Sequence, residues 1–326
     1  MSGGIRLCLA TAALGIFAGL WAAEPAPASP AARVILVAGA VGDPEFAPDF
    51  DAQIAAWTAT VRAAAASLVV VGREGGGTEP TDRERLRQLL EAEARDGRSE
   101  LWLVLVGHGT FDGREAKLNL RGPDVAAAEL AEWLKPFTRP LAVVHTTSSS
   151  APFIGKLAAP GRVIVSATRS GNEQNYARFG KYFAEALADA RSDLDRDGQV
   201  SLLESFLSAA TRTAEFYKTE GRLATEHPLV EDNGDGLGTP PDWFRGVLAT
   251  KRSSDGAAPD GTRAHQFHLV RSPAEQALST DERARRDELE RRLSELRARK
   301  PSLPEADYLR ELEAILLGLA EVYHGR

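Results

Sequence analysis

The stretch ELWLVLVGHG, residues 100–109, decides the fold of this chain. Its continuous apolar run, 101–106, is typical of a strand covered on both faces of a parallel sheet. Similar runs lie at residues 33–40, 68–72, 141–147 and 162–168. Between and after the runs lie stretches of helix-forming composition, at residues 52–66, 81–96, 126–137 and 176–190. Thr81 and Glu84 offer a capping box at the start of the second stretch. This alternation predicts an α/β domain with a mainly parallel sheet flanked by helices, and functional residues where strands end in loops.

The composition is that of an ordinary globular protein. The chain has 326 residues, 43% of them hydrophobic and 26% charged, with a formal net charge of -7. These values exclude a disordered or fibrous protein, and the length suits roughly two domains. No basic stripe with interleaved aromatic residues is present, so we expect no nucleic-acid partner.

The N-terminus has the pattern of a secretory signal peptide. Arg6 precedes the apolar run 7–23, and small residues follow it in EPAPASPAA, 24–32. We therefore expect residues 1–28 to be removed and the protein to be exported to the periplasm or the extracellular space, with no stable membrane span after cleavage. Cys8 is the only cysteine of the chain. The mature protein would then contain no thiol.

The C-terminal part is predicted to be a helical hairpin. Ser279 and Glu282 offer a capping box at the start of one helix, and leucines at helical spacing follow. The sequence RKPSLP breaks the run before a second apolar stripe. We divide the mature chain into an α/β domain (33–190), an acid-rich region that continues it (191–246), a linker or loop (247–273) and the hairpin (274–326).

A histidine and a hydroxyl cluster follow two successive strands. The motif Gly107-His108-Gly109 places an imidazole after the run 101–106, where glycines let the backbone turn sharply. The run 141–145 ends in His-Thr-Thr-Ser-Ser-Ser, 145–150. If these strands are neighbours, the imidazole and the hydroxyls lie at one sheet edge. The alternative is a structural histidine and a hydroxyl-rich loop that caps the next helix.

These motifs resemble the caspase and legumain superfamily of cysteine peptidases, over roughly residues 33–245. LVLVGHGTFDG, 103–113, is similar to the family's His-Gly motif, and 163–187 is similar to the strand, loop and helix that follow the nucleophile in bacterial members. LAVVHTTSSSAPF, 141–153, departs from the pattern because Ser148 stands where the family has its cysteine. The resemblance implies a peptidase-like fold with a degenerate His108/Ser148 dyad.

Ser148 needs more help than the cysteine it replaces. A thiol is partly ionised near neutral pH, whereas a hydroxyl must lose its proton to an oriented base during attack. Asp112 is the first candidate for the orienting third member, with Glu173 and His145 as alternatives. We expect a non-catalytic pseudopeptidase that binds a peptide or protein partner. A serine hydrolase using Ser148 and His108, and a structural module of an envelope assembly, remain the alternatives.

The sequence DLDRDGQVSLLE, 193–204, fits the twelve-residue EF-hand pattern at every ligand position. Calcium takes six to eight oxygen ligands, and helix-forming stretches flank the loop as an EF-hand requires. The predicted ligands are Asp193, Asp195, Asp197, the carbonyl of Gln199, Ser201 through water, and Glu204. Calcium is thus the expected cofactor, in a structural role. A solvated acidic turn is the alternative interpretation.

A second, weaker loop spans residues 231–242. Its candidate ligands are Glu231, Asn233, Asp235, Leu237, Thr239 and Asp242. The last of them is an aspartate, which is shorter than the usual glutamate, and two prolines precede it. The alternative for this segment is an Asn-Gly, Asp-Gly turn.

Overall fold

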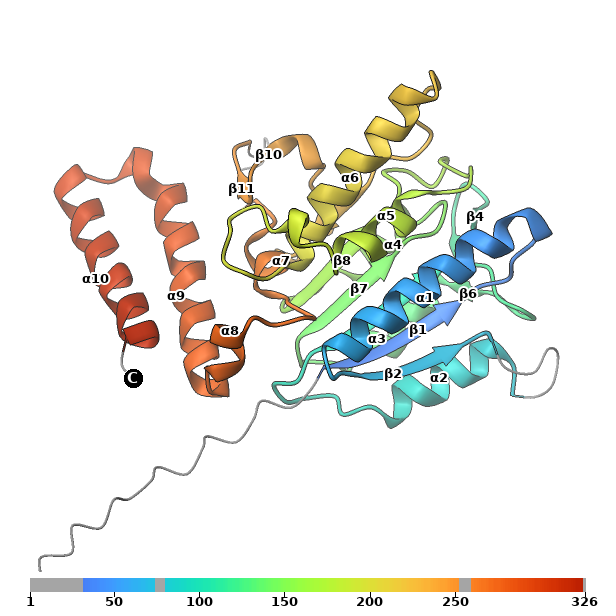
Figure 1. The fold of residues 1–326 in the computed structure, drawn as a ribbon, viewed down its shortest axis with the longest axis horizontal. Coiled ribbons are helices and arrows are strands. Elements are labelled where there is room, and N and C mark those ends of the chain that lie inside the picture. Colours follow the sequence, from blue (N-terminus) through green and yellow to red (C-terminus); the bar gives the residue numbers. More distant parts are fainter. Residues whose placement is uncertain (1–31, 74–79, 252–258, 325–326) are drawn as a thin grey trace, which may run out of the picture.

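Strand β3 (Leu101–Val106) lies in the interior of the sheet with every residue buried. The computed structural model describes residues 32–73, 80–251 and 259–324. The main sheet has the order β2-β1-β3-β7-β8-β9, and all its pairs are parallel except β8 with β9 (Figure 1). The predicted α/β class with a mainly parallel sheet is confirmed.

The five apolar runs all form strands, and the helical stretches between them form helices. The strands are β1 (Arg33–Ala38), β2 (Ser67–Val71), β3, β4 (Gly109–Phe111), β5 (Ala116–Leu118), β6 (Val125–Ala126), β7 (Leu141–His145), β8 (Arg162–Ser166), β9 (Leu229–Glu231), β10 (Phe244–Arg245) and β11 (Leu248–Ala249). The α-helices are α1 (Ala47–Ala63), α2 (Asp82–Ala92), α3 (Ala127–Leu134), α4 (Ala151–Leu157), α5 (Phe179–Ala186), α6 (Leu202–Thr219), α7 (Thr262–Gln266), α8 (Pro273–Ala277), α9 (Thr280–Arg299) and α10 (Glu305–His324).

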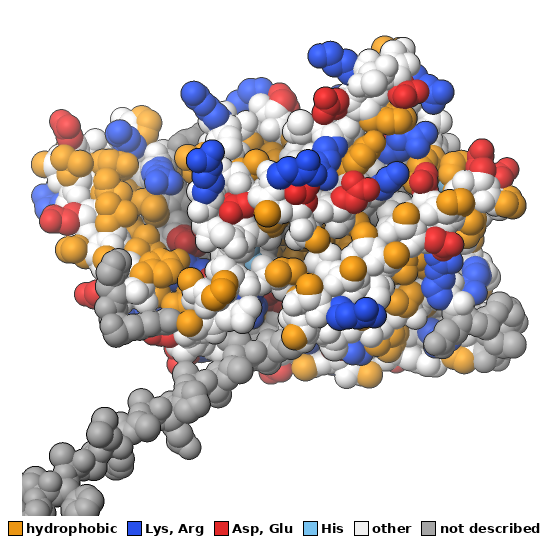
Figure 2. Space-filling model, viewed as in Figure 1, with side chains coloured by type: hydrophobic (Ala, Val, Ile, Leu, Met, Phe, Trp, Pro, Cys, Tyr) orange, Lys and Arg blue, Asp and Glu red, His pale blue; other side chains and the backbone are white. Residues whose placement is uncertain are grey.

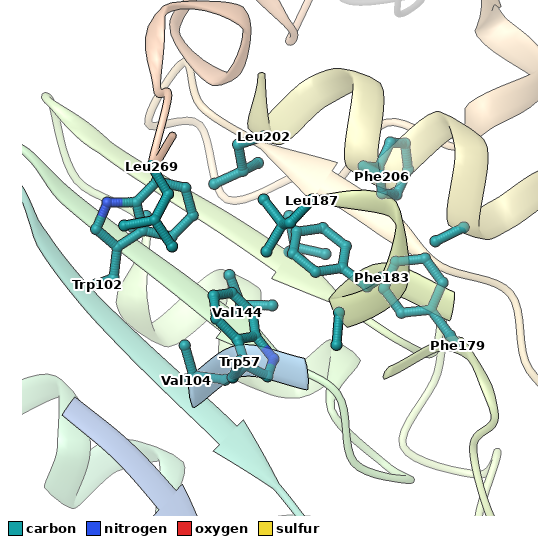
Figure 3. Packing of buried hydrophobic residues seen from close by; sticks show 14 of the residues in the cluster. Trp57, Trp102, Val104, Val144, Phe179, Phe183, Leu187, Leu202, Phe206 and Leu269 are labelled. Carbon is teal, nitrogen blue, oxygen red and sulfur yellow. The ribbon is translucent and has the colours of Figure 1, made fainter. Parts of the chain in front are cut away.

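Successive strand residues feed two hydrophobic cores. Because side chains alternate along a strand, Val34 and Leu36 of β1 face a core with α1, α5 and α6, while Ile35 and Val37 face α2, α3 and α4. Figure 3 shows the first core, in which Trp57 stacks on Phe183 with ring centroids 6.0 Å apart. Because both faces of these strands are buried, their sequences are continuous apolar runs.

Several short elements have no counterpart in the prediction. Directly after His108, β4, β5 and β6 form a small antiparallel sheet. Helix α4 follows β7, where the capping alternative for the serine run expects a helix, but Ser150 at its N-cap makes no side-chain capping bond. Strand β9 adds an antiparallel edge to the main sheet. These elements are too short for hydrophobic periodicity to identify them.

Helix α2 begins with the predicted capping box. The Thr81 hydroxyl accepts from the Glu84 amide, and the Glu84 carboxylate accepts from the Thr81 amide at 2.8 Å. We expect Thr81→Ala to lower the free energy of unfolding by about 1 kcal/mol, because the Glu84 amide loses its hydroxyl partner. Denaturant unfolding measures this loss, with Thr81→Ser as the matched control. A Thr81→Ala protein as stable as the parent would contradict the assignment.

Helices α9 and α10 form the predicted hairpin, beside the α/β layers (Figure 1). The capping box of Ser279 and Glu282 is present, and Leu289, Leu296 and Ile315 are buried between the two helices. Helix α8 is tied to α9 because Glu275 pairs with two arginines that are themselves buried, Arg283 and Arg286.

Part of the segment 247–273, expected to be a linker or loop, is buried. Helix α7 lies in it, and Ala264, Phe267 and Leu269 belong to the first core. The Phe267 carbonyl also accepts from the Leu202 amide at 2.8 Å, at the start of α6. The polar residues at the start of this segment suggested a linker, but the apolar residues that follow them pack into the first core.

The predicted signal peptide, residues 1–28, lies outside the described residues. Within the described ranges, no helix combines the length and apolar character needed to cross a membrane.

Candidate functional site

The predicted meeting of His108 with the hydroxyl cluster depends on the pairing of β3 with β7. The two strands are parallel neighbours, with Leu105 opposite His145, so their carboxyl ends lie at one sheet edge. Gly107 adopts a φ of +146°, and a Cβ there would lie 3.0 Å from the Gly39 Cα. Glycine at this position therefore lets the chain turn out of β3 against β1.

The Ser148 hydroxyl is fully engaged by the backbone of Gly109. Its Oγ donates to the Gly109 carbonyl at 3.0 Å and accepts from the Gly109 amide at 3.1 Å. The side chain is buried, with 2% of the residue exposed. The hydroxyl thus bonds to the backbone of the residue that follows His108, and not to the imidazole.

The His108 ring is held by an aromatic pocket and a backbone carbonyl. Its Nε2 lies 3.1 Å from the Val41 carbonyl oxygen, and the rings of Phe46, Phe50 and Tyr176 surround it. Burial of the half-buried ring lowers its pKa below the ordinary value, with a smaller opposing effect from the Val41 carbonyl. Across the described residues, His108 and Ser148 share no hydrogen bond.

Each candidate for a third catalytic member has another partner. Asp112 is exposed and accepts from the amides of Arg114 and Glu115 in a turn. Glu173 contacts His227, with Oε1 2.5 Å from Nδ1. His145 is completely buried, its Nδ1 lies 3.1 Å from the Thr147 hydroxyl, and burial lowers its pKa to about 3. The structure therefore places none of the three in a hydrogen bond with His108.

The other hydroxyls after β7 connect it to the loop after β8. Ser149, at a φ of +54°, donates from its Oγ to the Gly171 carbonyl. The Ser150 Oγ accepts from the amides of Ala167 and Thr168. These bonds satisfy buried backbone groups, so the serine run has a structural role at this edge.

The first acidic loop brings its aspartates together between α5 and α6. Carboxylate oxygens of Asp193, Asp195 and Asp197 all lie within 4.8 Å of one another. Gly198 makes the turn with a φ of +88°, and its amide donates to Asp193. The Gln199 amide donates to Asp197, which shapes the end of the turn. Three convergent carboxylates are a donor set that suits Ca²⁺.

Glu204, the expected closing ligand, is buried and also caps α6. One oxygen accepts from the amide and hydroxyl of Ser201, and the other accepts from the amides of Leu194 and Asp195. A capping box that the sequence analysis did not identify is thus built from two predicted ligands, Ser201 and Glu204.

The start of the second loop is largely bonded within itself. Glu231 is completely buried in β9; its Oε1 accepts from the Gly234 amide, and burial raises its pKa to about 7. The Asn233 side-chain oxygen accepts from the Asp235 amide, and Asp235 accepts from the Leu237 amide. This is the hydrogen-bond pattern of consecutive Asx turns.

The candidate ligands at the end of the second loop bond to residues outside the loop. The Thr239 hydroxyl donates to Asp260 at 2.6 Å, and exposed Asp242 pairs with Lys251. Asp260 also accepts from the amides of Asp232 and Asn233. Within the described ranges, the convergent His and carboxylate groups come from the first loop and His265, and none includes a residue of the second loop.

Asp260, His227 and His265 were not predicted as site residues. Asp260 holds the second loop, His227 pairs with Glu173, and the His265 Nε2 lies 3.0 Å from Asp195. Each of these partners is distant in the sequence, so no local motif signals the contact.

Comparison with protein-family models and with curated proteins gives no match to this chain. Among solved structures, the Drosophila initiator caspase Dronc has 12% identity and a TM-score of 0.42, covering 64% of this chain and 81% of that one. Caspase-1 from Spodoptera frugiperda has 10% identity and a TM-score of 0.40, covering 62% and 86%. A Geobacter sulfurreducens protein has 12% identity and a TM-score of 0.43, covering 65% and 98%.

Proposed function

We propose that this chain is an exported, calcium-binding protein of caspase-like fold that is not a catalyst and binds a peptide or protein partner. The fold assignment is supported by the His-Gly motif after β3 and the serine at the nucleophile position after the adjacent strand β7. Export rests on the signal-peptide pattern of residues 1–28.

The observation that carries the non-catalytic proposal is the hydrogen bonding of Ser148. An activated serine needs its proton directed at a base, and here the proton is directed at the Gly109 carbonyl. His108 bonds instead to Val41, and Asp112, Glu173 and His145 are engaged elsewhere. The arrangement lacks the base and the orienting group that a serine nucleophile requires.

We expect the purified protein to remain unlabelled by a fluorophosphonate serine probe, with or without Ca²⁺, and to cleave no peptide library. The reason is that an unactivated hydroxyl reacts no faster than other serines. The measurement is made beside Ser148→Ala and His108→Ala, with Ser170→Ala as the matched serine control. Labelling or turnover that disappears in both Ser148→Ala and His108→Ala, but persists in Ser170→Ala, would overturn the proposal.

The serine hydrolase is the second candidate, and one observation favours it. The Ser148 hydroxyl bonds directly to the residue that follows His108, so the two side chains of the predicted dyad come from adjoining segments. The same probe experiment decides between the two.

A structural envelope module is the third candidate. It is favoured by the exposed apolar side chains of α10, Leu309, Leu316, Leu317 and Tyr323, on the hairpin at the left of Figure 2. A protein that stays monomeric and captures no envelope partner would count against this candidate.

A further inference from the structure

A mixed cluster of nitrogen and oxygen donors lies beside the first acidic loop. Asp195, Glu204 and His265 each offer one ligand atom, and these atoms lie within 4.8 Å of one another. His265 belongs to α7, outside the EF-hand pattern, and its Nε2 is 3.0 Å from the Asp195 Oδ2. This contact is a hydrogen bond that already brings an imidazole nitrogen and a carboxylate oxygen face to face, as two ligands of one ion would be.

The position of His265 is fixed by the fold. Its amide donates to the Gly261 carbonyl, and the next-but-one residue, Phe267, packs on Trp102 in the core. The Ala264 amide donates to the buried carboxylate of Asp232 at 2.7 Å. A histidine on such an anchored turn presents its imidazole to Asp195 without large rearrangement, which favours metal binding.

The donor types select a class of metal. Calcium takes oxygen ligands, whereas imidazole nitrogen suits first-row transition ions such as Zn²⁺ and Co²⁺. Three protein ligands leave further coordination positions open. Asp195 and His265 line a pocket of about 480 Å³ together with Thr262, Glu290, Ser294 and Arg297. An ion at this cluster would therefore face a space that admits water or a small ligand.

We propose that Asp195, Glu204 and His265 form a site for a divalent first-row transition ion, separate in its donor set from the calcium group of Asp193, Asp195 and Asp197. The site shares Asp195 with that group and Glu204 with the predicted calcium ligands, so an ion in one disfavours an ion in the other. The site requires neither the calcium proposal nor the pseudopeptidase proposal to be correct.

The test is a Co²⁺ titration of the purified protein followed by visible absorption. The parent is expected to bind one Co²⁺ with a spectrum that includes nitrogen ligation, and His265→Gln should weaken binding at least about tenfold. His227→Gln, which removes another histidine paired with a carboxylate, serves as the matched control and should bind as the parent does. Equal Co²⁺ affinity in the parent and His265→Gln would overturn the proposal.

Two further measurements separate this result from other causes. Ca²⁺ affinity is measured in the same variants, and His265→Gln should leave it unchanged because Ca²⁺ does not need the imidazole. Parallel loss of Ca²⁺ and Co²⁺ affinity would show damage to the loop and would contradict a histidine ligand.

If His265→Gln melts at a lower temperature without metal, His265→Cys provides another ligand there. Recovered Co²⁺ binding with a thiolate charge-transfer band supports the site, and equally weak binding contradicts it.

Discussion

Calcium at one hundred times its dissociation constant should raise the free energy of unfolding by about 2.7 kcal/mol. The expected cause is that the folded loop brings the carboxylates of Asp193, Asp195 and Asp197 within 4.8 Å of one another, whereas the unfolded chain does not. Like charges so close oppose folding, and a bound cation relieves that repulsion. Thermal melting in EDTA and in excess Ca²⁺ measures the difference.

Asp193→Ala separates this effect from general binding of cations to an acidic protein. Asp193 belongs to the calcium group and not to the cluster with His265, so its removal affects the first and leaves the second intact. The variant should lose most of the calcium-dependent stabilisation, while Asp96→Ala, on an exposed turn, should keep it. Identical melting of the parent in EDTA and in Ca²⁺ would show that the loop assignment is wrong.

Stability without metal should fall as the pH rises from about 6.5 to 8. Burial raises the pKa of Asp260 to about 8 and that of Glu231 to about 7, from 3.8 and 4.5. In this window the folded state keeps protons that the unfolded state has already lost, so deprotonation favours unfolding. One such proton lowers the free energy of unfolding by roughly 2 kcal/mol across the window.

Below about pH 6.5, buried histidines change the free energy of unfolding in the opposite direction, so the effect of the acids is measured above that pH. Burial lowers the pKa of His145 and His268, so their contribution is lost as the pH falls below the unfolded value near 6.5 and is constant above it. Asp260→Asn mimics the protonated acid and should flatten the profile between pH 6.5 and 8. Urea unfolding in EDTA measures both proteins. A parent whose stability is constant or rises in this window contradicts the assignment.

The burial of the Ser148 hydroxyl has a consequence for its chemistry. A buried hydroxyl needs hydrogen-bond partners more than a thiol does, and Ser148 finds them in the amide and carbonyl of Gly109. The bond that the hydroxyl donates to the Gly109 carbonyl also directs its proton to that carbonyl and not to the His108 ring. The environment that satisfies the buried Ser148 hydroxyl therefore also disfavours its use as a nucleophile.

The sequence by itself determined the five parallel strands of the main sheet, the helices between them, the two predicted capping boxes and the convergent first loop. These features depend on residues close along the chain, because side-chain periodicity and capping act over a few positions. The short sheet β4-β5-β6 and the buried α7 segment left no such local signal.

Only the tertiary structure decided which side chains meet. Ser148 bonds to Gly109 across 39 positions, Glu173 to His227 across 54, and Asp195 to His265 across 70. Such contacts are set by the path of the loops between the elements and by the need to satisfy each buried polar group, neither of which is written in a local pattern. For this reason the sequence identified the residues at the sheet edge and in the loop, and packing assigned their partners.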